Sequence, residues 1–210
     1  MVQNQEDVYY YITVMNENYS HPEMPKGAEA GILKGMYNFS KSKAKGEKVQ
    51  LMGSGVILRE VIAAAELLEK DWGVSADIWS VPSFTELRRE GLECDRWNML
   101  NPEKPQKPSY VAQCLKDAKG PVIASTDYMK SFAEQIQRFV PNKFVALGTD
   151  GFGRSDSREA LRDFFEVDRH YVTIAALKAL SDEGKLPAAK VAEAVKKYKL
   201  NPNKPNPTSI

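Results

Sequence analysis

The stretch that most constrains the fold covers residues 48–68, with the sequence KVQLMGSGVILREVIAAAELL. It predicts a β-strand, a glycine turn and an α-helix in direct succession. The first residues form a short apolar run, Gly53 and Gly55 permit a sharp turn, and the apolar residues from 56 to 68 recur at helical spacing. A strand, a tight turn and a helix in this order form the repeating unit of α/β domains.

The same unit is where dinucleotide-binding domains carry the motif GxGxxG, whose glycines bring phosphate against helix N–H groups. Here Leu58 stands where the third glycine is required. The next expected strand, 76–81, runs on into Pro82 and Ser83, with no Asp or Glu at its end to bind ribose. The sequence therefore favours a structural turn over an NAD site.

Strands and helices alternate along the rest of the chain, which predicts a doubly wound α/β/α sandwich on a mainly parallel sheet. After the first strand, further core strands are expected at 76–81, 122–124 and 144–147. Helices are expected at 27–39, 56–68, 109–115, 128–140, 158–165, 171–180 and 187–198, with one more from the capping-box pattern Ser83 to Glu86. Residues 95–108 contain three prolines and are expected to be irregular.

Both ends of the chain differ from this core. Residues 8–14 contain three consecutive tyrosines and predict a β-strand in need of a partner, and Pro22 and Pro25 mark a linker after it. Residues 201–210 contain three prolines and predict a disordered or draped tail.

Composition narrows the classes of function. The net charge is +1, with an excess of +5 from Lys185 onward, but no aromatic interleaving or arginine cluster accompanies those lysines, so we expect no nucleic-acid partner. No apolar run approaches the roughly 20 residues of a membrane span, and we expect no membrane contact and a cytoplasmic location. Cys94 and Cys114 lack CxxC spacing and are expected to stay reduced and inert. His21 is expected to be a surface side chain rather than a base.

Two segments carry candidate site residues. Ser125 and Thr126 follow the 122–124 strand, at the edge where open α/β sheets bind ligands, although a cap for the 128–140 helix is the favoured interpretation. The loop GTDGFGRSD comprises Gly148, Thr149, Asp150, Gly151, Phe152, Gly153, Arg154, Ser155 and Asp156. Its glycines allow an aromatic side chain to be presented at a loop tip. Ser155 or Asp156 is expected to cap the helix that begins near Arg158.

Several motifs resemble one family. KVQLMGSGVILREVIAAAELL, SVPSFTELRREG, CDRWNML, ASTDYMKSFAEQI and LGTDGFGRSDSREALRDFFEVD are similar to the C-terminal domain of the homodimeric bacterial pyruvate dehydrogenase E1 component and, more distantly, of transketolases. The resemblance implies a three-layer α/β/α domain on a mixed, mostly parallel five-stranded sheet. It further implies residues 1–25 as a linker and strand from a preceding domain, 26–200 as the C-terminal domain and 201–210 as a tail.

For the parent enzyme, the resemblance implies thiamine diphosphate and Mg²⁺ as cofactors, decarboxylation of pyruvate and acetyl transfer to lipoyl groups of E2. This chain lacks the GDG pattern that holds the cofactor in that family. We therefore expect a structural and assembly domain, inactive alone, without catalytic, cofactor-binding or metal residues. Its expected partners are the rest of the E1 chain, a second E1 subunit and E2. By the same resemblance, the 148–156 loop lies near domain and subunit contacts, and the alternative is a self-contained loop.

A second hypothesis comes from a different class of protein. Ser54, Ser125, Thr126 and the 148–156 loop would then converge at the carboxyl ends of the strands and form a small-molecule or nucleotide binding module.

Overall fold

A computed structural model describes residues 2–9, 11–12, 14 and 18–210. Within these residues, five strands form one mixed sheet in the order β1-β3-β2-β4-β5. β1 runs antiparallel to β3, and the other neighbours are parallel. The strands are β1 (Tyr37–Ser40), β2 (Lys48–Gly53), β3 (Ser75–Ser80), β4 (Val122–Ser125) and β5 (Phe144–Leu147). The mostly parallel five-stranded sheet expected from the resemblance is confirmed.

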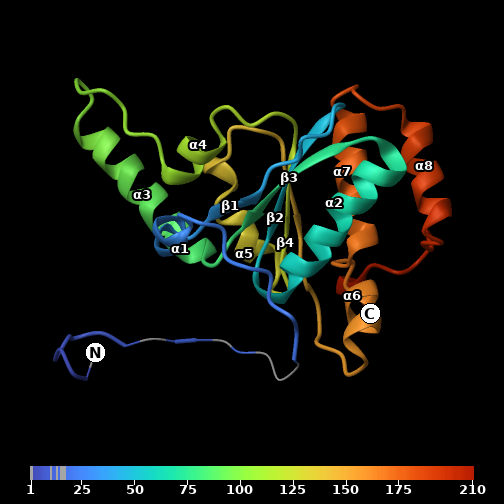
Figure 1. Cartoon of the computed structure of the whole chain (residues 1–210), viewed down its shortest axis with the longest axis horizontal. Coiled ribbons are helices and arrows are strands. Elements are labelled where there is room, and N and C mark those ends of the chain that lie inside the picture. Colours follow the sequence, from blue (N-terminus) through green and yellow to red (C-terminus); the bar gives the residue numbers. More distant parts are fainter. Residues whose placement is uncertain (1, 10, 13, 15–17) are drawn as a thin grey trace.

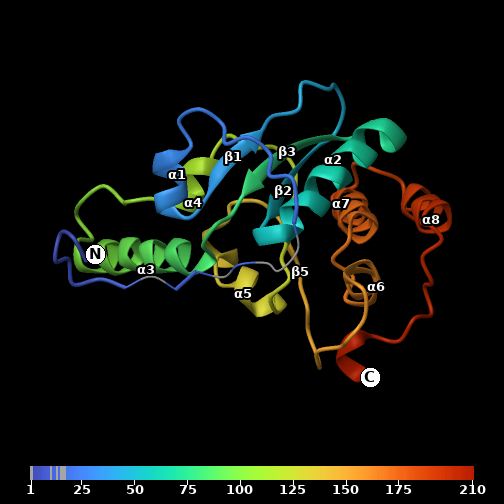
Figure 2. The ribbon, with the colours of Figure 1, turned by 60° about the horizontal axis from the view of Figure 1, so that its bottom comes forward.

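Helices cover both faces of the sheet and give the domain three layers (Figures 1 and 2). The α-helices are α1 (Glu29–Lys34), α2 (Leu58–Trp72), α3 (Phe84–Leu100), α4 (Tyr110–Leu115), α5 (Lys130–Glu134), α6 (Arg158–Phe164), α7 (Arg169–Asp182) and α8 (Ala188–Lys197). Short 3₁₀ turns are η1 (Gly55–Ile57), η2 (Gln137–Phe139) and η3 (Pro207–Ser209). No helix among the described residues is both long enough and apolar enough to cross a membrane.

The sheet separates two apolar cores. Val49 and Leu51 of β2 point into one core, which α2, α7 and α8 cover, and Met52 points into the other, which α3, α4 and α5 cover. β2 is buried on both faces, as expected for a central parallel strand. Its buried Gln50 is satisfied, because it accepts a hydrogen bond from Trp79 Nε1 at 2.9 Å and donates one to a backbone carbonyl at 3.0 Å.

The strand, turn and helix predicted for residues 48–68 are present. Gly53 is required because a Cβ at this position would lie 2.7 Å from the Cα of Leu58, where the helix starts back over the sheet. The helix begins at Leu58, two residues later than expected, after η1. It continues to Trp72 and ends at Gly73, whose left-handed backbone gives a favourable C-terminal cap.

The helix predicted for 27–39 is wrong in its second half. α1 ends at Lys34, where Gly35 adopts a φ of 97°, and the chain then enters β1. Pairing with β3 supplies the backbone hydrogen bonds of this segment, so sheet formation overrides the near-helical apolar spacing that includes Met36 and Tyr37. β1 is the antiparallel strand that the resemblance implied.

Two other helix boundaries differ from the prediction. The expected irregular segment 95–108 is helical as far as Leu100, because Asn98 pairs with the backbone of Lys107 in both directions and holds the loop against α3. The expected helix 128–140 is broken into α5 and η2. Ile136 and Phe139 are both buried, and a 3₁₀ turn places residues three apart on the same side.

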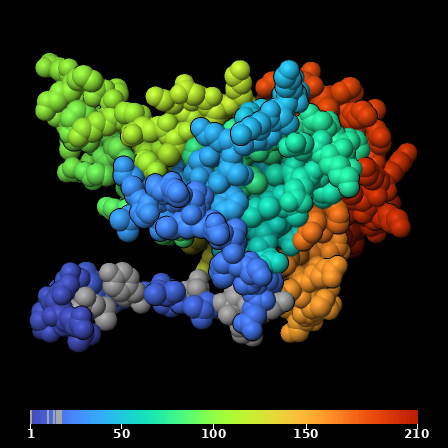
Figure 3. Space-filling model, viewed as in Figure 1, coloured from blue at the N-terminus to red at the C-terminus, as the bar shows by residue number. Residues whose placement is uncertain are grey.

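The two ends of the chain differ in their contacts. Tyr10 and Thr13 of the predicted strand 8–14 lie outside the described residues, and the described members of that segment form no strand. Residues such as Tyr9 and Tyr11 are exposed on a segment that extends away from the domain (Figure 3). The C-terminal tail instead lies against the domain, because Pro207 is buried and Lys204 Nζ donates to the Asp163 carbonyl at 2.6 Å.

Candidate site at the carboxyl edge of the sheet

The 148–156 loop is fastened to the start of α5. The Thr149 backbone N–H donates to the Tyr128 carbonyl at 2.8 Å, and Asp150 Oδ1 accepts from the Lys130 backbone N–H at 2.9 Å. Asp150 therefore supplies the hydrogen-bond acceptor that the first turn of α5 requires. Neither Ser125 nor Thr126 caps this helix as predicted. Thr126 Oγ1 instead accepts a hydrogen bond from the Tyr128 backbone N–H, two residues further along the chain, at 3.2 Å.

The tip of the loop presents an aromatic side chain to solvent. Phe152 is 84% exposed, as the sequence predicted, while Gly151 packs against the tail. A Cβ at Gly151 would lie 2.6 Å from the Pro207 carbonyl oxygen, and its φ of 89° also favours glycine. Arg154 folds back, with its guanidinium 5.3 Å from the centre of the Phe164 ring.

The predicted cap of α6 is wrong by one or two residues. Ser157 is the N-cap, and its Oγ accepts from the Ala160 backbone N–H at 3.3 Å. Asp156 Oδ1 accepts a hydrogen bond from the Ser157 backbone N–H, and Ser155 lies one residue before Asp156. A Ser at 157 has the same capping chemistry as one at 155, so residue type alone did not fix the position.

The three serine and threonine ligand candidates lie inside the domain. Ser54, Ser125 and Thr126 are all buried. Within the described part of the chain, Ser125 Oγ has no hydrogen-bond partner. None of these three residues lines the pocket described next, and their role as ligands stays a prediction.

A pocket of about 260 Å³ opens at this edge of the sheet. It lies between η1, the 148–156 loop and α6, and it brings together apolar, basic and acidic side chains. Its lining consists of Val56, Ile57, Asp127, Thr149, Gly153, Arg154, Arg158, Leu161, Arg162, Phe165 and Val167. Sequence reasoning found the loop members but missed the α6 residues, although Arg158 and Arg162 are spaced four apart and therefore share one helix face.

A buried carboxylate holds the back of this pocket in place. The Glu60 side chain is 6% exposed, and it accepts hydrogen bonds from Arg162 Nη1 at 3.3 Å and Arg169 Nε at 2.9 Å. Arg169 also donates through Nη2 at 3.1 Å and its backbone N–H at 3.1 Å. Burial alone would raise the pKa of Glu60, but the hydrogen bonds from Arg169 and the charges of Arg169 and Arg162 outweigh it and lower that pKa below 4.5.

The N-terminal segment meets the domain beside the pocket. Arg162 Nη2 donates to the Tyr19 hydroxyl at 3.1 Å, and the Arg59 guanidinium lies 4.3 Å from the centre of the Tyr19 ring. Arg59 Nη1 also donates to the Ser20 carbonyl at 3.3 Å. Residues far apart in the sequence therefore converge here, from the N-terminal segment, α2 and α6.

One carboxylate stands among the basic side chains of this edge. Among the described residues, no three His, Cys, Asp or Glu side chains converge in a way that could hold a metal ion. Asp127 is the carboxylate of the pocket lining, beside three arginines. Although its side chain reaches solvent, the surrounding protein desolvates it and raises its pKa, while the charge of Arg162 acts in the opposite direction.

The comparisons with known proteins agree with this fold. Residues 35–168 match the family described as the transketolase-like C-terminal domain. The chain belongs to this family. A solved structure of the Leishmania mexicana transketolase aligns with 75% of this chain and 20% of its own chain, with a TM-score of 0.50 and 18% sequence identity. This part of the transketolase therefore has the same fold as the chain.

Curated relatives share much higher sequence identity. The chain is 64% identical to the pyruvate dehydrogenase E1 component of Cupriavidus necator, over its full length and 24% of the relative. It is 60% identical to the same component of Pseudomonas aeruginosa, over 99% of this chain and 24% of the relative. It is 54% identical to the Escherichia coli component, over 98% of this chain and 23% of the relative. The chain thus spans about a quarter of the length of these relatives and matches their C-terminal part.

Proposed function

We propose that this chain is the C-terminal structural and assembly domain of a cytoplasmic pyruvate dehydrogenase E1 component and is inactive on its own. The proposal rests mainly on the 64% identity to an E1 component across the full chain, which covers only 24% of that relative's length. In the complete enzyme, the other domains hold thiamine diphosphate and Mg²⁺, decarboxylate pyruvate and pass the acetyl group to E2. This domain has its own boundaries at 26–200, between a linker at 1–25 and a tail at 201–210.

Exposed apolar side chains support an assembly role. Tyr128 and Met129 are exposed at the start of α5, and the loop that presents Phe152 is hydrogen-bonded to that start. Large exposed apolar side chains gathered on linked segments are typical of interaction surfaces. The expected partners are the remainder of the E1 chain and the second subunit of a homodimer.

The 148–156 loop supplies a direct test of the interface. In complete E1, we expect replacement of Phe152 and Arg154 by Ala to weaken dimerisation at least severalfold, measured by analytical ultracentrifugation, because buried aromatic and arginine side chains dominate interface energies. In the 210-residue chain, the same double variant should keep its melting temperature within about 4 °C, the shift that about 1 kcal/mol causes. Unchanged dimerisation of complete E1 would support the self-contained loop instead.

The absence of independent activity has its own test. The purified 210-residue chain, supplied with thiamine diphosphate, Mg²⁺ and pyruvate, should release carbon dioxide no faster than buffer. The same chain should restore activity when it is added to an E1 that lacks residues equivalent to 26–200. Pyruvate decarboxylation by the isolated chain would contradict the proposal.

A further inference from the structure

The N-terminal segment rests on the domain through Tyr19. Of the described residues from 2 to 24, Tyr19 alone is half-buried, and the others are exposed. Tyr9 and Tyr11 of the same segment are almost fully exposed. The segment contains tyrosines in both environments, so the burial of Tyr19 reflects contacts that the domain makes with this residue.

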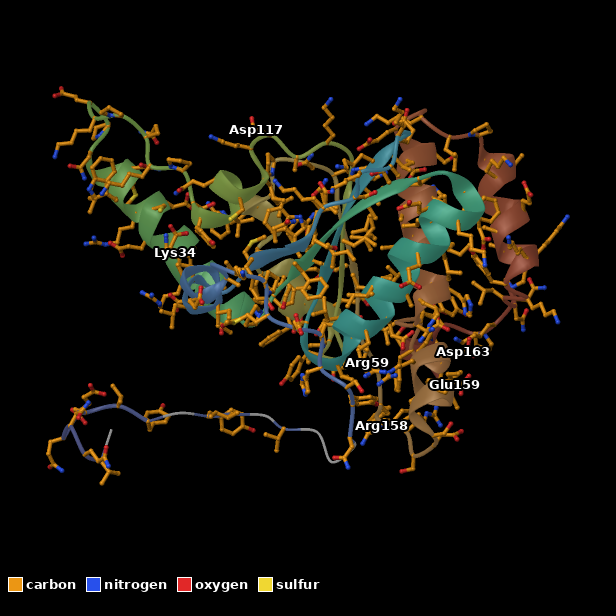
Figure 4. All side chains as sticks on the ribbon, in the orientation of Figure 1. Lys34, Arg59, Asp117, Arg158, Glu159 and Asp163 are labelled. Atoms are coloured by element: carbon orange, nitrogen blue, oxygen red, sulfur yellow. The ribbon has the colours of Figure 1, made fainter. Side chains whose placement is uncertain are left out.

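Two guanidinium groups hold Tyr19. The Arg59 guanidinium lies 4.3 Å from the centre of the Tyr19 ring, and that of Arg162 lies 6.0 Å away. A guanidinium at such a distance is attracted to the face of an aromatic ring. Arg162 Nη2 also donates a hydrogen bond to the Tyr19 hydroxyl at 3.1 Å, and Arg59 Nη1 donates one to the Ser20 carbonyl at 3.3 Å. Figure 4 shows Arg59 at the end of α2 that the N-terminal segment passes.

Arg162 is itself fixed by a buried carboxylate. Its Nη1 donates to Glu60 Oε1 at 3.3 Å, and Glu60 Oε2 accepts from Arg169 Nε at 2.9 Å. The side chains of Arg162 and Glu60 are both largely buried. A guanidinium that is already ordered loses little further entropy when it binds a tyrosine. Tyr19 is therefore joined to the charge network that connects α2, α6 and α7.

We propose that Tyr19 anchors residues 18–25 to the domain as a strap and fixes the place at which the preceding chain leaves it. The far end of the strap is also held, because the Pro25 carbonyl accepts from the Ala28 backbone N–H at 3.2 Å, just before α1. The anchor moves the start of the proposed domain from residue 26 to residue 18. It also places the exit beside α2 and α6, at the carboxyl edge of the sheet (Figure 1). For complete E1, this inference rests on the proposed function, because it supposes that the preceding chain leads to the other domains.

Cleavage of the 210-residue chain by chymotrypsin, which cuts after aromatic residues, tests the anchor. When opening and closing are fast, cleavage at a protected site follows the population of the open form. We expect cleavage after Tyr19 to be slower than in a free peptide of residues 14–25, whereas Tyr9 and Tyr11 serve as unprotected sites in the same molecule. Initial rates at each site are measured by mass spectrometry.

Variants identify the contacts that hold the strap. Arg59→Gln should speed cleavage after Tyr19 about tenfold, the change that about 1.4 kcal/mol produces. Tyr19→Phe keeps the ring but loses the hydroxyl, and it should speed cleavage at this position about fivefold after correction for the free peptide that contains Phe. Neither change should alter cleavage after Tyr9 and Tyr11. Arg88→Gln is the matched control, because Arg88 is an exposed arginine of α3 in the opposite layer.

Two results on the 210-residue chain would overturn the anchor. The first is cleavage after Tyr19 at the rate of the free peptide. The second is an unchanged rate after Tyr19 in an Arg59→Gln variant that melts at the temperature of the unmodified chain. If Arg59→Gln fails to fold, Tyr19→Phe takes its place in this comparison, because it removes only one hydroxyl.

Complete E1 tests whether the anchor fixes the exit of the preceding chain. Arg59→Gln should also speed cleavage at Tyr19 there, and an unchanged rate would overturn this role. Failure of the proposed assembly role is a separate result, because it is measured as unchanged dimerisation of the Phe152 and Arg154 variant. That outcome would leave the cleavage rates of the 210-residue chain as expected.

Discussion

Replacement of Glu60 by Ala tests the charge network that joins α2, α6 and α7. The change removes the acceptor for four hydrogen bonds and leaves Arg162, whose side chain is 16% exposed, without its carboxylate. Removal of one partner from a buried ion pair costs about 3–5 kcal/mol. The Arg169 side chain is 46% exposed, so water can hydrate its guanidinium once Glu60 is removed. We therefore expect a loss of stability at the low end of this range, about 3 kcal/mol. The melting temperature should then fall by about 6–12 °C in a chain of this length.

The acidity of Glu60 gives this prediction a second, independent readout. Its pKa is lowered in the folded state, so its contribution to stability is fully present above the ordinary value of 4.5 and is lost as the pH falls through the folded pKa. Glu60→Gln keeps the shape of the side chain but cannot ionise. The difference in free energy of unfolding between the unmodified chain and Glu60→Gln should therefore be largest at neutral pH and shrink as the pH falls below 4.5.

Thermal denaturation followed by circular dichroism at neutral and acidic pH measures both effects. Glu66→Ala is the matched control, because Glu66 is an exposed residue of the same helix and its replacement should change stability by less than about 0.5 kcal/mol. An equal loss of stability in Glu60→Ala and Glu66→Ala would refute the reasoning. A difference between the unmodified chain and Glu60→Gln that does not change with pH would refute the electrostatic part.

Three shorter predictions follow from other parts of the structure. Gly120→Ala should lower stability by more than about 3 kcal/mol, because its φ is 79° and a Cβ would overlap the Lys48 carbonyl oxygen; chemical denaturation will measure this, and a loss below about 1 kcal/mol would contradict it. Burial and a hydrogen bond to Glu90 raise the pKa of Cys94 to about 11, so its thiolate fraction at neutral pH is about 100-fold below that of a thiol with the ordinary value of 9.0. Because a more basic thiolate is also more nucleophilic, we expect its alkylation by iodoacetamide to be about tenfold slower than that of such a thiol, and an equal rate would be inconsistent with the structure. Deletion of residues 1–25 should leave unfolding cooperative and cost about 1 kcal/mol through loss of the contacts of Tyr19 with Arg59 and Arg162, whereas a broad, non-cooperative transition would place that segment inside the core.

The parts of the fold that local pattern specifies could be predicted from sequence. The apolar run at β2, the glycine turn after it and the Ser83 cap of α3 each combine residue type with near-neighbour spacing, and all three are present. The Glu86 side chain departs from the capping-box pattern, because it pairs with Arg89. β1 was missed because its hydrogen bonds go to β3, about 40 residues away, and local spacing does not contain that partner.

The candidate site also has one part that local sequence specifies and one part that depends on distant residues. The glycines and the aromatic residue of the 148–156 loop identified it as unusual from the sequence alone. Glu60 could not be assigned, because its partners lie 102 and 109 residues away and an acidic residue in the first turn of a helix is ordinary. The pocket wall includes Arg162, which pairs with that carboxylate.

The packing of Gly151 against Pro207 has a consequence for the order of events during protein synthesis. The loop emerges from the ribosome well before the residues that complete its surroundings, since α6, α7, α8 and the following turn must be made first. Domains generally fold as units, so the last residues of a domain must emerge before its folding is complete. The loop is anchored to the start of α5 by earlier residues, but Gly151 reaches its final environment only once the turn that contains Pro207 has been made.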